Sequence, residues 1–412
     1  MADSRLAQFQ SYLILFMTIK QIGVGTFSTT PLMRQYINDV LDKARISYGE
    51  YSLQFEQEFA ALHDSFFAVL SNSGTSSLHV AIQALKELHG WQDGDEIIVP
   101  AVTFVASVNV ILHNRLKPVL VDIDSRYYEI DAEQVEDKLT DRTRAIMPVH
   151  LFGQPCDMTA IRDIADARNL AIIEDSCEAM FVKHNRMAVG AWGDVGCFST
   201  YVAHLISTGV GGLATTNIPE LAIKMRSLVN HGRDGIYMSI DDNDADNLRE
   251  VIERRFNFES IGHSFRITEL EAALGLAQLA TWQDMIAKRQ RNASTLIDTL
   301  AGQTNYLQLP ETRPLSEHSW MMFPLILLKE PKFDLCEYLE QHGIETREML
   351  PLVNQPCYAG LWDSDDYPIA QWVDRCGLYV GCHQDLSETD MQYIGTTICN
   401  YWEQRGKIKG SY

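Results

Sequence analysis

The stretch AIIEDSCEA, residues 171–179, joins an almost wholly apolar run to an aspartate, Asp175. Such a run is typical of a strand that is buried on both faces of a sheet. An unpaired carboxylate at its end would be costly, so Asp175 needs a cation or several hydrogen-bond donors. A protonated pyridine nitrogen would satisfy it, and the carboxylate would keep that nitrogen protonated and the ring an electron sink.

Similar apolar runs precede this stretch and alternate with longer amphipathic segments. They are FFAVL (66–70), EIIVP (96–100), KPVLVDI (117–123) and RAIMPVH (144–150). This alternation predicts an α/β fold with a largely parallel central sheet. Ligands of such sheets bind at the carboxyl ends of the strands, so we expect the functional residues directly after these runs.

The second half of the chain predicts a smaller companion domain. Residues 266–301 carry apolar side chains at helical spacing and predict two helices, the second leading out of the large domain. Beyond about residue 315 the pattern is that of a compact α+β unit. We therefore divide the chain into an N-terminal extension (1–24), a large domain (25–300) and a small C-terminal α+β domain (301–412).

Composition narrows the functional classes. The formal net charge is −21 and no Lys/Arg-rich run occurs, which disfavours nucleic acid as a partner. Eight cysteines lie without a CxxC pair in a large chain, which predicts reduced thiols and a cytoplasmic location. The early apolar run at 12–17 is too short to span a membrane. No His/Cys/Asp/Glu group has the spacing of a metal site.

Two segments before Asp175 fit a ligand that is both phosphorylated and planar. SNSGTSSLHVAIQAL (71–85) places Gly-Thr-Ser-Ser immediately before an amphipathic helix. Free N–H groups and the positive helix end there would hold a phosphate, aided by the hydroxyls of Thr75 and Ser76. An ordinary helix cap is the alternative. Phe104 follows the run at 96–100, where its ring either stacks on a planar ligand or packs in the core.

A third segment follows Asp175. Residues 197–216, CFSTYVAHLISTGVGGLATT, read as a strand, a glycine-bearing loop and a second strand. Ser199 can add a hydroxyl to the phosphate, and His204 lies on the loop.

In this order the segments resemble the pyridoxal-phosphate (PLP) enzymes of the DegT/DnrJ/EryC1/StrS sugar aminotransferase family, which have the aspartate aminotransferase fold (PLP fold type I). The resemblance covers nearly the whole chain from about residue 25. It rests on GEYSLQFEQEFA, SGTSSL, GDEIIVPAVTFVAS, PVLVDID, IIEDSCEA, GDVGCFST, GVGGLATT, VNHGRD and SFRITELEAALGLAQL.

The resemblance implies a role for each matching residue. Gly74, Thr75 and Ser199 would anchor the cofactor phosphate, Phe104 would stack on its ring, and Asp175 would pair with the pyridine nitrogen. Asn230, in VNHGRD, would reach the phosphate of the neighbouring subunit's cofactor, which implies a homodimer with shared active sites. Glu178 stands where the family usually has a Gln that contacts the ring oxygen, and this is a departure.

The larger departure is His204. The family's aminotransferases have, eight residues before the position of Gly212, the Lys that bonds covalently to the cofactor. This chain has no Lys between Lys183 and Lys224. Imidazole cannot form a stable Schiff base, so the resemblance implies PLP or pyridoxamine phosphate (PMP) held without a covalent bond.

A branch of the family, the sugar 3-dehydratases, has His at this position, and AHLI (203–206) resembles it. One type, which makes sugars such as colitose, regenerates PMP with glutamate. The other acts on CDP sugars and also needs an iron–sulfur cluster held by C-terminal cysteines that include a Cys-x-Cys pair, which this chain lacks. YVGCHQDLS (379–387) is similar to the glutamate-using type.

The resemblance therefore implies removal of the C3 hydroxyl from a nucleotide-linked 4-keto-6-deoxy sugar, in deoxysugar or surface-polysaccharide biosynthesis. His204 would remove a proton from the cofactor's C4′ and return it to the departing hydroxyl. A lysine would instead reprotonate the sugar at C4 and complete a transamination.

Two other functions stay open. SNSGTSSLHVAIQAL and SFRITELEAALGLAQL read like ordinary sugar aminotransferases, so the chain is alternatively an aminotransferase whose Lys has been lost or substituted. A non-catalytic PLP-binding relative is the third reading, in which His204 is an ordinary loop residue. Four further residues are candidates for the substrate site or else ordinary surface or core residues: His231, Arg233, His263 and His383.

Overall fold

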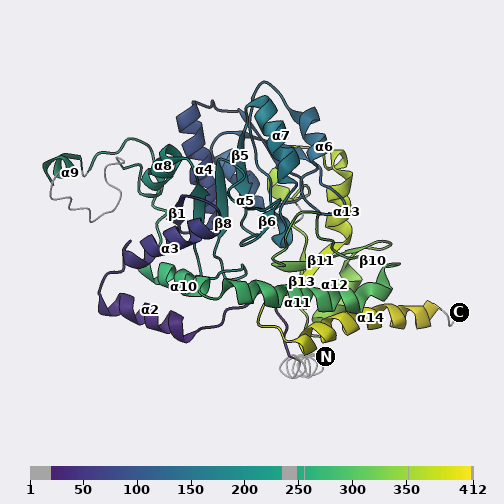
Figure 1. Ribbon diagram of the computed structural model, residues 1–412. Coiled ribbons are helices and arrows are strands. Elements are labelled where there is room, and N and C mark those ends of the chain that lie inside the picture. Colours follow the sequence, from purple (N-terminus) through teal and green to yellow (C-terminus); the bar gives the residue numbers. More distant parts are fainter. Residues whose placement is uncertain (1–19, 234–247, 255, 351, 410–412) are drawn as a thin grey trace, which may run out of the picture.

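A seven-stranded sheet lies at the centre of the computed structural model, which describes residues 20–233, 248–254, 256–350 and 352–409 (Figure 1). The strand order is β1-β9-β8-β5-β4-β2-β3. Strands β3, β2, β4, β5 and β8 are parallel, and β9 is antiparallel to both β8 and β1. The strands are β1 (Phe67–Ser71), β2 (Glu96–Pro100), β3 (Lys117–Val121), β4 (Thr143–Ile146), β5 (Ala171–Asp175), β8 (Val195–Ser199) and β9 (Gly212–Thr216). The prediction of a largely parallel sheet is confirmed.

Apolar side chains cover both faces of this sheet, because successive residues of a strand point to opposite faces. In β2, Ile97 belongs to the main core and Ile98 to a second core that includes Met158 and Ile161 of α7. The elements around the sheet are α2 (Pro31–Asp42), α3 (Glu50–Leu62), α4 (Gly74–His89), α5 (Val105–His113), α6 (Ala132–Val135), η1 (Glu136–Lys138), η2 (Leu151–Gly153), α7 (Met158–Arg168), β6 (Lys183–His184), β7 (Met187–Ala188), α8 (Pro219–Val229) and α9 (Leu248–Arg254).

Two successive helices, α10 (Glu269–Leu279) and α11 (Trp282–Leu300), run from beneath the central sheet to the second sheet (Figure 1). This confirms the two helices predicted for residues 266–301. The second sheet has four antiparallel strands in the order β10-β11-β13-β12. Its elements are η3 (Ala301–Gln303), β10 (Leu307–Gln308), β11 (Met322–Leu327), α12 (Phe333–Gln341), β12 (Thr346–Glu348), η4 (Pro356–Tyr358), η5 (Ser364–Asp366), α13 (Pro368–Cys376), β13 (Gly377–Gly381) and α14 (Glu388–Lys409). The domain boundary after residue 300 stays a prediction.

The described part of the predicted N-terminal extension is built into the fold. Ile22 forms a parallel bridge with Ile344, and the Val24 N–H donates to Glu345 Oε2 at 2.8 Å. Gly25 packs on the loop after β8, since an added Cβ there would lie 2.9 Å from Ala203 Cα. The N-terminal segment therefore connects the second sheet to that loop.

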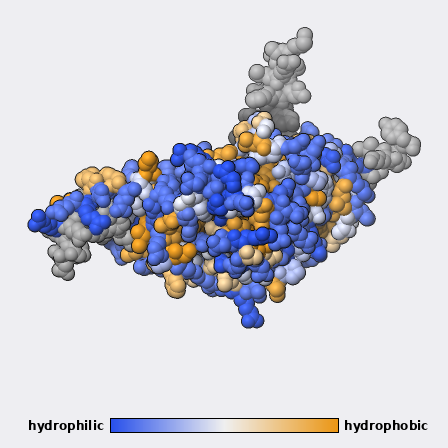
Figure 2. Space-filling model, turned by 90° about the horizontal axis from the view of Figure 1, so that it is seen from above, coloured by the Kyte–Doolittle hydropathy of each residue, from blue (hydrophilic) through white to orange (hydrophobic). Residues whose placement is uncertain are grey.

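The surface is mostly hydrophilic on the face shown in Figure 2, with smaller hydrophobic groups between. Within the described residues, no helix combines the length and the hydrophobicity needed to cross a membrane. The apolar run at 12–17 lies outside the described residues, and the cytoplasmic location stays a prediction. All eight cysteines are free thiols.

Candidate active site

Three segments predicted to carry functional residues meet at one edge of the central sheet. Asp175 ends β5, Ser199 ends the neighbouring β8, and Gly74 begins α4. An added Cβ on Gly74 would lie 2.7 Å from both Ser199 Cβ and Cys177 Sγ. Only glycine allows this approach, so the start of α4 is held against the ends of the two strands.

Asp175 is buried and has two donors. Its Oδ2 accepts from the Ser107 hydroxyl at 2.7 Å, and its Oδ1 accepts from the Cys177 N–H at 3.2 Å. The Ser107 hydroxyl also lies 2.7 Å from Thr103 Oγ1. Ser107 was not predicted as a site residue, although it lies in the segment GDEIIVPAVTFVAS (94–107). Part of the predicted need for donors is therefore met within the protein.

The turn before α4 differs from the prediction in where the helix begins. Gly-Thr-Ser-Ser was expected immediately before the helix, but Ser73 is the N-cap and these residues form the first turn. The reason is that Ser73 Oγ accepts from the Ser76 N–H at 3.0 Å. The Ser76 hydroxyl donates to Asn72 Oδ1 at 2.6 Å, whereas Thr75 is exposed. Of the two hydroxyls predicted to hold a phosphate, that of Ser76 already has an acceptor.

Glu178 is a second carboxyl group near the end of β5. Its Oε2 accepts from the Phe152 N–H at 2.8 Å. Burial, reinforced by the negative charge of Asp175, raises the pKa of Glu178 to about 7. The two carboxyl groups thus differ in setting, and Glu178 holds a proton in a large share of molecules at neutral pH.

His204 lies on the loop between β8 and β9, as the sequence predicts. Its N–H donates to the Tyr201 carbonyl at 2.9 Å, and its Nδ1 is buried without a partner among the described residues. Burial lowers the pKa of His204 to about 4, so the imidazole is neutral at neutral pH. A neutral imidazole can accept a proton.

The ring of Phe104 is available to a ligand. Phe104 is the N-cap residue of α5 and its side chain is 59 % exposed. The alternative reading, that Phe104 is a core residue, is wrong, because the ring is not packed away from solvent.

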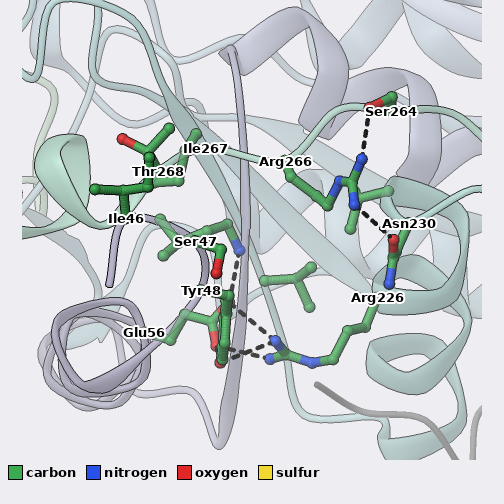
Figure 3. Close-up of a pocket in the computed structure, with 13 residues that line it drawn as sticks. Ile46, Ser47, Tyr48, Glu56, Arg226, Asn230, Ser264, Arg266, Ile267 and Thr268 are labelled. Atoms are coloured by element: carbon green, nitrogen blue, oxygen red, sulfur yellow. Dashed lines mark hydrogen bonds and ion pairs between the residues drawn. The ribbon is translucent and has the colours of Figure 1, made fainter. Parts of the chain in front are cut away.

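Asn230 lies in a separate pocket of about 380 Å³ (Figure 3). It is the only residue of the predicted cofactor set that lines this pocket. Its Oδ1 accepts from Arg266 at 3.2 Å, and Arg266 also donates to Ser264 Oγ at 2.9 Å. On α8, one turn before Asn230, Arg226 pairs with Glu56 at 2.8 Å. Arg266 was not predicted as a site residue, although it lies in the segment SFRITELEAALGLAQL (264–279).

Three of the four candidates for a substrate site lie near one another, since the His231 N–H donates to the His263 carbonyl at 2.8 Å and the Arg233 N–H donates to the Asn230 carbonyl at 3.3 Å. His231 Nε2 lies 3.2 Å from Arg266, near Asn230. The Arg233 guanidinium lies over the ring of Phe258. The His263 ring stacks on Phe265 at 4.5 Å. His383 is 5 % exposed, and burial lowers its pKa to about 4. These positions give no single group of four.

Residues 29–399 match the DegT/DnrJ/EryC1/StrS aminotransferase family. The chain belongs to this family. Among its relatives is a GDP-perosamine synthase of Caulobacter vibrioides, 35% identical over 88% of this chain and 93% of that protein. Another is a GDP-4-keto-6-deoxy-D-mannose 3-dehydratase of Yersinia pseudotuberculosis, 30% identical over 85% of this chain and 92% of that protein.

A solved structure gives the same fold. The GDP-4-keto-6-deoxy-D-mannose-3-dehydratase of E. coli, with bound hydrated PLP, superposes with a TM-score of 0.83 at 28% identity over 92% of this chain and 99% of that chain. The predicted family and PLP type I fold are therefore confirmed. The relatives include both a GDP-perosamine synthase and a 3-dehydratase, so family membership leaves the choice of reaction to the site.

Proposed function

We propose that this chain uses PLP and PMP to remove the C3 hydroxyl of a nucleotide-linked 4-keto-6-deoxy sugar. The observation that carries the proposal is His204, a neutral imidazole on the β8–β9 loop whose Nδ1 is buried. The segment from Lys183 to Lys224 contains no lysine between its ends, so this loop offers no amine for a covalent bond to the cofactor.

The residues at the sheet edge fit a phosphorylated pyridine. The Phe104 ring is exposed beside the start of α5, Asp175 ends its strand as a buried carboxylate, and Gly74 leaves room where a Cβ would collide. The Nδ1 of His204 is buried and lacks a partner among the described residues. Gly74, Thr75 and Ser199 would hold the phosphate, Phe104 would lie on the ring, and Asp175 would keep the ring nitrogen protonated. When bound, the cofactor supplies an amine and an electron-withdrawing ring.

His204 would move the proton. As a neutral base it accepts a proton, and the resulting imidazolium is a strong acid because burial disfavours the charge. It can therefore return the proton to the departing C3 hydroxyl, which leaves as water. Glu178 stands where the family usually has a Gln that contacts the ring oxygen. A protonated carboxyl of Glu178 would donate a hydrogen bond there in place of the Gln amide.

The balance of the reaction requires an amino donor. Breaking the C3–O bond reduces the sugar by two electrons, and we propose that glutamate supplies them as it becomes 2-oxoglutarate and ammonia. The water lost from C3 is matched by the water that releases the ammonia. GDP sugars are the first substrates to test, because two of the named relatives carry GDP in their names.

Transamination is the second candidate. It is favoured by the 35% identity to a GDP-perosamine synthase. This reaction would put nitrogen on C4 and leave the C3 oxygen in place. His204 would then have to return its proton to the sugar carbon rather than to a leaving hydroxyl.

We further propose that the active enzyme is a homodimer. The pocket of Asn230 and Arg266 contains no other residue of the predicted cofactor set, which fits a contribution to a second copy's site. Three apolar side chains on the His204 loop are exposed by 39–53 %: Tyr201, Val202 and Val210. A second copy would cover such a patch. Sedimentation of the full chain tests this, and a monomer at catalytic concentration would contradict it.

The test of the reaction is product mass. The protein is incubated with PLP, glutamate and GDP-4-keto-6-deoxy-D-mannose, with other nucleotide-4-keto-6-deoxy sugars alongside, and the products are identified by mass spectrometry. We expect loss of the C3 oxygen. Gain of an amino group at C4 would establish the aminotransferase instead. PLP binding without turnover on any of these sugars would point to the non-catalytic alternative.

A further inference from the structure

The loop that carries His204 is fixed at its base. The Thr200 N–H donates to the Gly211 carbonyl at 2.9 Å, and the Thr208 N–H donates to the Thr200 carbonyl at 2.9 Å. The hydroxyls of these two threonines lie 2.6 Å apart. Residues 201–207 extend from this base, and His204 is in their middle.

One side chain from another element binds the far end of the loop. Gln278, near the end of α10, accepts from the Ser207 N–H at 3.0 Å through Oε1 and donates to the Ser207 carbonyl at 2.7 Å through Nε2. The same Nε2 donates to the Leu274 carbonyl of α10 at 2.8 Å, which fixes the orientation of the amide. The side-chain amide therefore pairs with Ser207 as a neighbouring strand would.

Ser207 depends on this pairing. It is buried, and its own hydroxyl has no hydrogen-bond partner among the described residues. Without Gln278 its backbone N–H and carbonyl would also lose the partners that the structure gives them, and a buried unpaired polar group costs about 1–3 kcal/mol. The loop would then move to find water or other partners.

We propose that Gln278 is a positioning residue for His204, holding the loop so that the imidazole lies where the proton must be moved. This inference rests on the proposed function, because it assumes that His204 carries the proton. Gln278 would act through Ser207, which lies three residues from His204, and need not touch the substrate itself. Small displacements of a catalytic group matter, since about 1 Å can cost on the order of 10²-fold in rate.

Two variants separate this role from general stability. Gln278→Leu removes all three hydrogen bonds at similar side-chain size, whereas Gln278→Glu keeps an acceptor for the Ser207 N–H but places an oxygen against the Ser207 carbonyl. The matched control is Gln392→Leu, because Gln392 is an exposed glutamine on α14 whose side chain, among the described residues, bonds only to Glu388.

The first readout needs no turnover. Hydrogen–deuterium exchange of the peptide covering residues 200–211 is compared between the wild type and each variant, with PLP present. We expect Gln278→Leu to speed exchange in this peptide about tenfold or more, since a lost hydrogen bond exposes the Ser207 amide. The Gln392→Leu control should leave it unchanged. Unchanged exchange in Gln278→Leu would overturn the proposal.

The second readout is kinetic and uses whichever product the enzyme forms, so failure of the dehydratase proposal does not decide it. We expect kcat of Gln278→Leu to fall about 10–100-fold while the sugar KM and the PLP affinity stay within about threefold. Gln278→Glu should fall between. A loss of activity that matches only the loss of folded protein, with normal kcat per folded molecule, would show a purely structural role and overturn the proposal.

Discussion

The turn before α4 and the β8–β9 loop both lie at the end of β8, yet they differ in how many of their polar side-chain atoms have hydrogen-bond partners. In the turn, the Ser71 hydroxyl bonds to the Ser73 carbonyl at 2.8 Å and lies 2.8 Å from the Ser77 hydroxyl, and the Ser76 hydroxyl bonds to Asn72. In the loop, His204 Nδ1 and Ser207 Oγ are buried without partners among the described residues. We propose that the turn is the anchor for the cofactor phosphate, whereas the loop has two buried polar atoms without partners among the described residues.

The largest expected effect on activity comes from a substitution in the β8–β9 loop. His204→Asn should lower kcat for deoxygenation about 10²–10⁴-fold, because it removes the proton carrier. It should leave PLP affinity within about threefold, since the anchor lies in the turn and at Asp175. Product mass and the absorbance of bound PLP measure the two effects. A variant that keeps most of its kcat would contradict the role of His204 and break the distinction between the two regions.

A substitution in the turn before α4 should instead lower stability and weaken PLP binding. Gly74→Ala places a Cβ 2.7 Å from Ser199 Cβ and Cys177 Sγ, so α4 must shift away from the strand ends. Overpacking of this kind costs about 1–3 kcal/mol of unfolding free energy, and the shift should also weaken PLP binding about tenfold. Gly302→Ala is the control, because nothing lies within 4 Å of an added Cβ there. If Gly74→Ala binds PLP normally, the turn is not the anchor.

The fold was predictable from the sequence because its signals are local. Apolar runs, amphipathic segments and the strand-loop-strand pattern at 197–216 each lie within one segment, so the sheet, the helices α10 and α11 and the place of His204 could all be assigned. The antiparallel direction of β1 relative to β9 could not be read in this way, because it depends on a pairing between residues 67 and 216.

The unpredicted parts of the site are long-range contacts. Ser107 bonds to Asp175 across 68 residues of sequence, and Gln278 bonds to Ser207 across 71. Neither contact leaves a spacing pattern in the chain, because each depends on how separate elements pack. An ordinary helix cap was one of the two readings of residues 71–85, and the structure shows such a cap at Ser73. The sequence did not tell which residue is the N-cap, since any of several serines could begin the helix and only the backbone decides among them.

The smallest expected effect concerns Glu178. Its Oε2 accepts one hydrogen bond, from the Phe152 N–H, so its polar side chain is intermediate between the paired hydroxyls of the turn and the unpaired atoms of the loop. Its pKa is raised from 4.5 to about 7 in the folded protein, so between these values the folded state binds more protons than the unfolded one. Stability must therefore fall as pH rises through this window, by up to about 3 kcal/mol.

The Glu178→Gln variant cannot titrate at this position and should not show this loss of stability. The unfolding free energy of the variant minus that of wild type should therefore increase between about pH 5 and about pH 8. Urea unfolding of the full chain at the two pH values measures it, with the exposed Glu337→Gln as control. Parallel pH dependences in Glu178→Gln and wild type would show that Glu178 is already ionised at neutral pH, and the comparison would then place it with the anchor rather than with the proton-carrying side of the site.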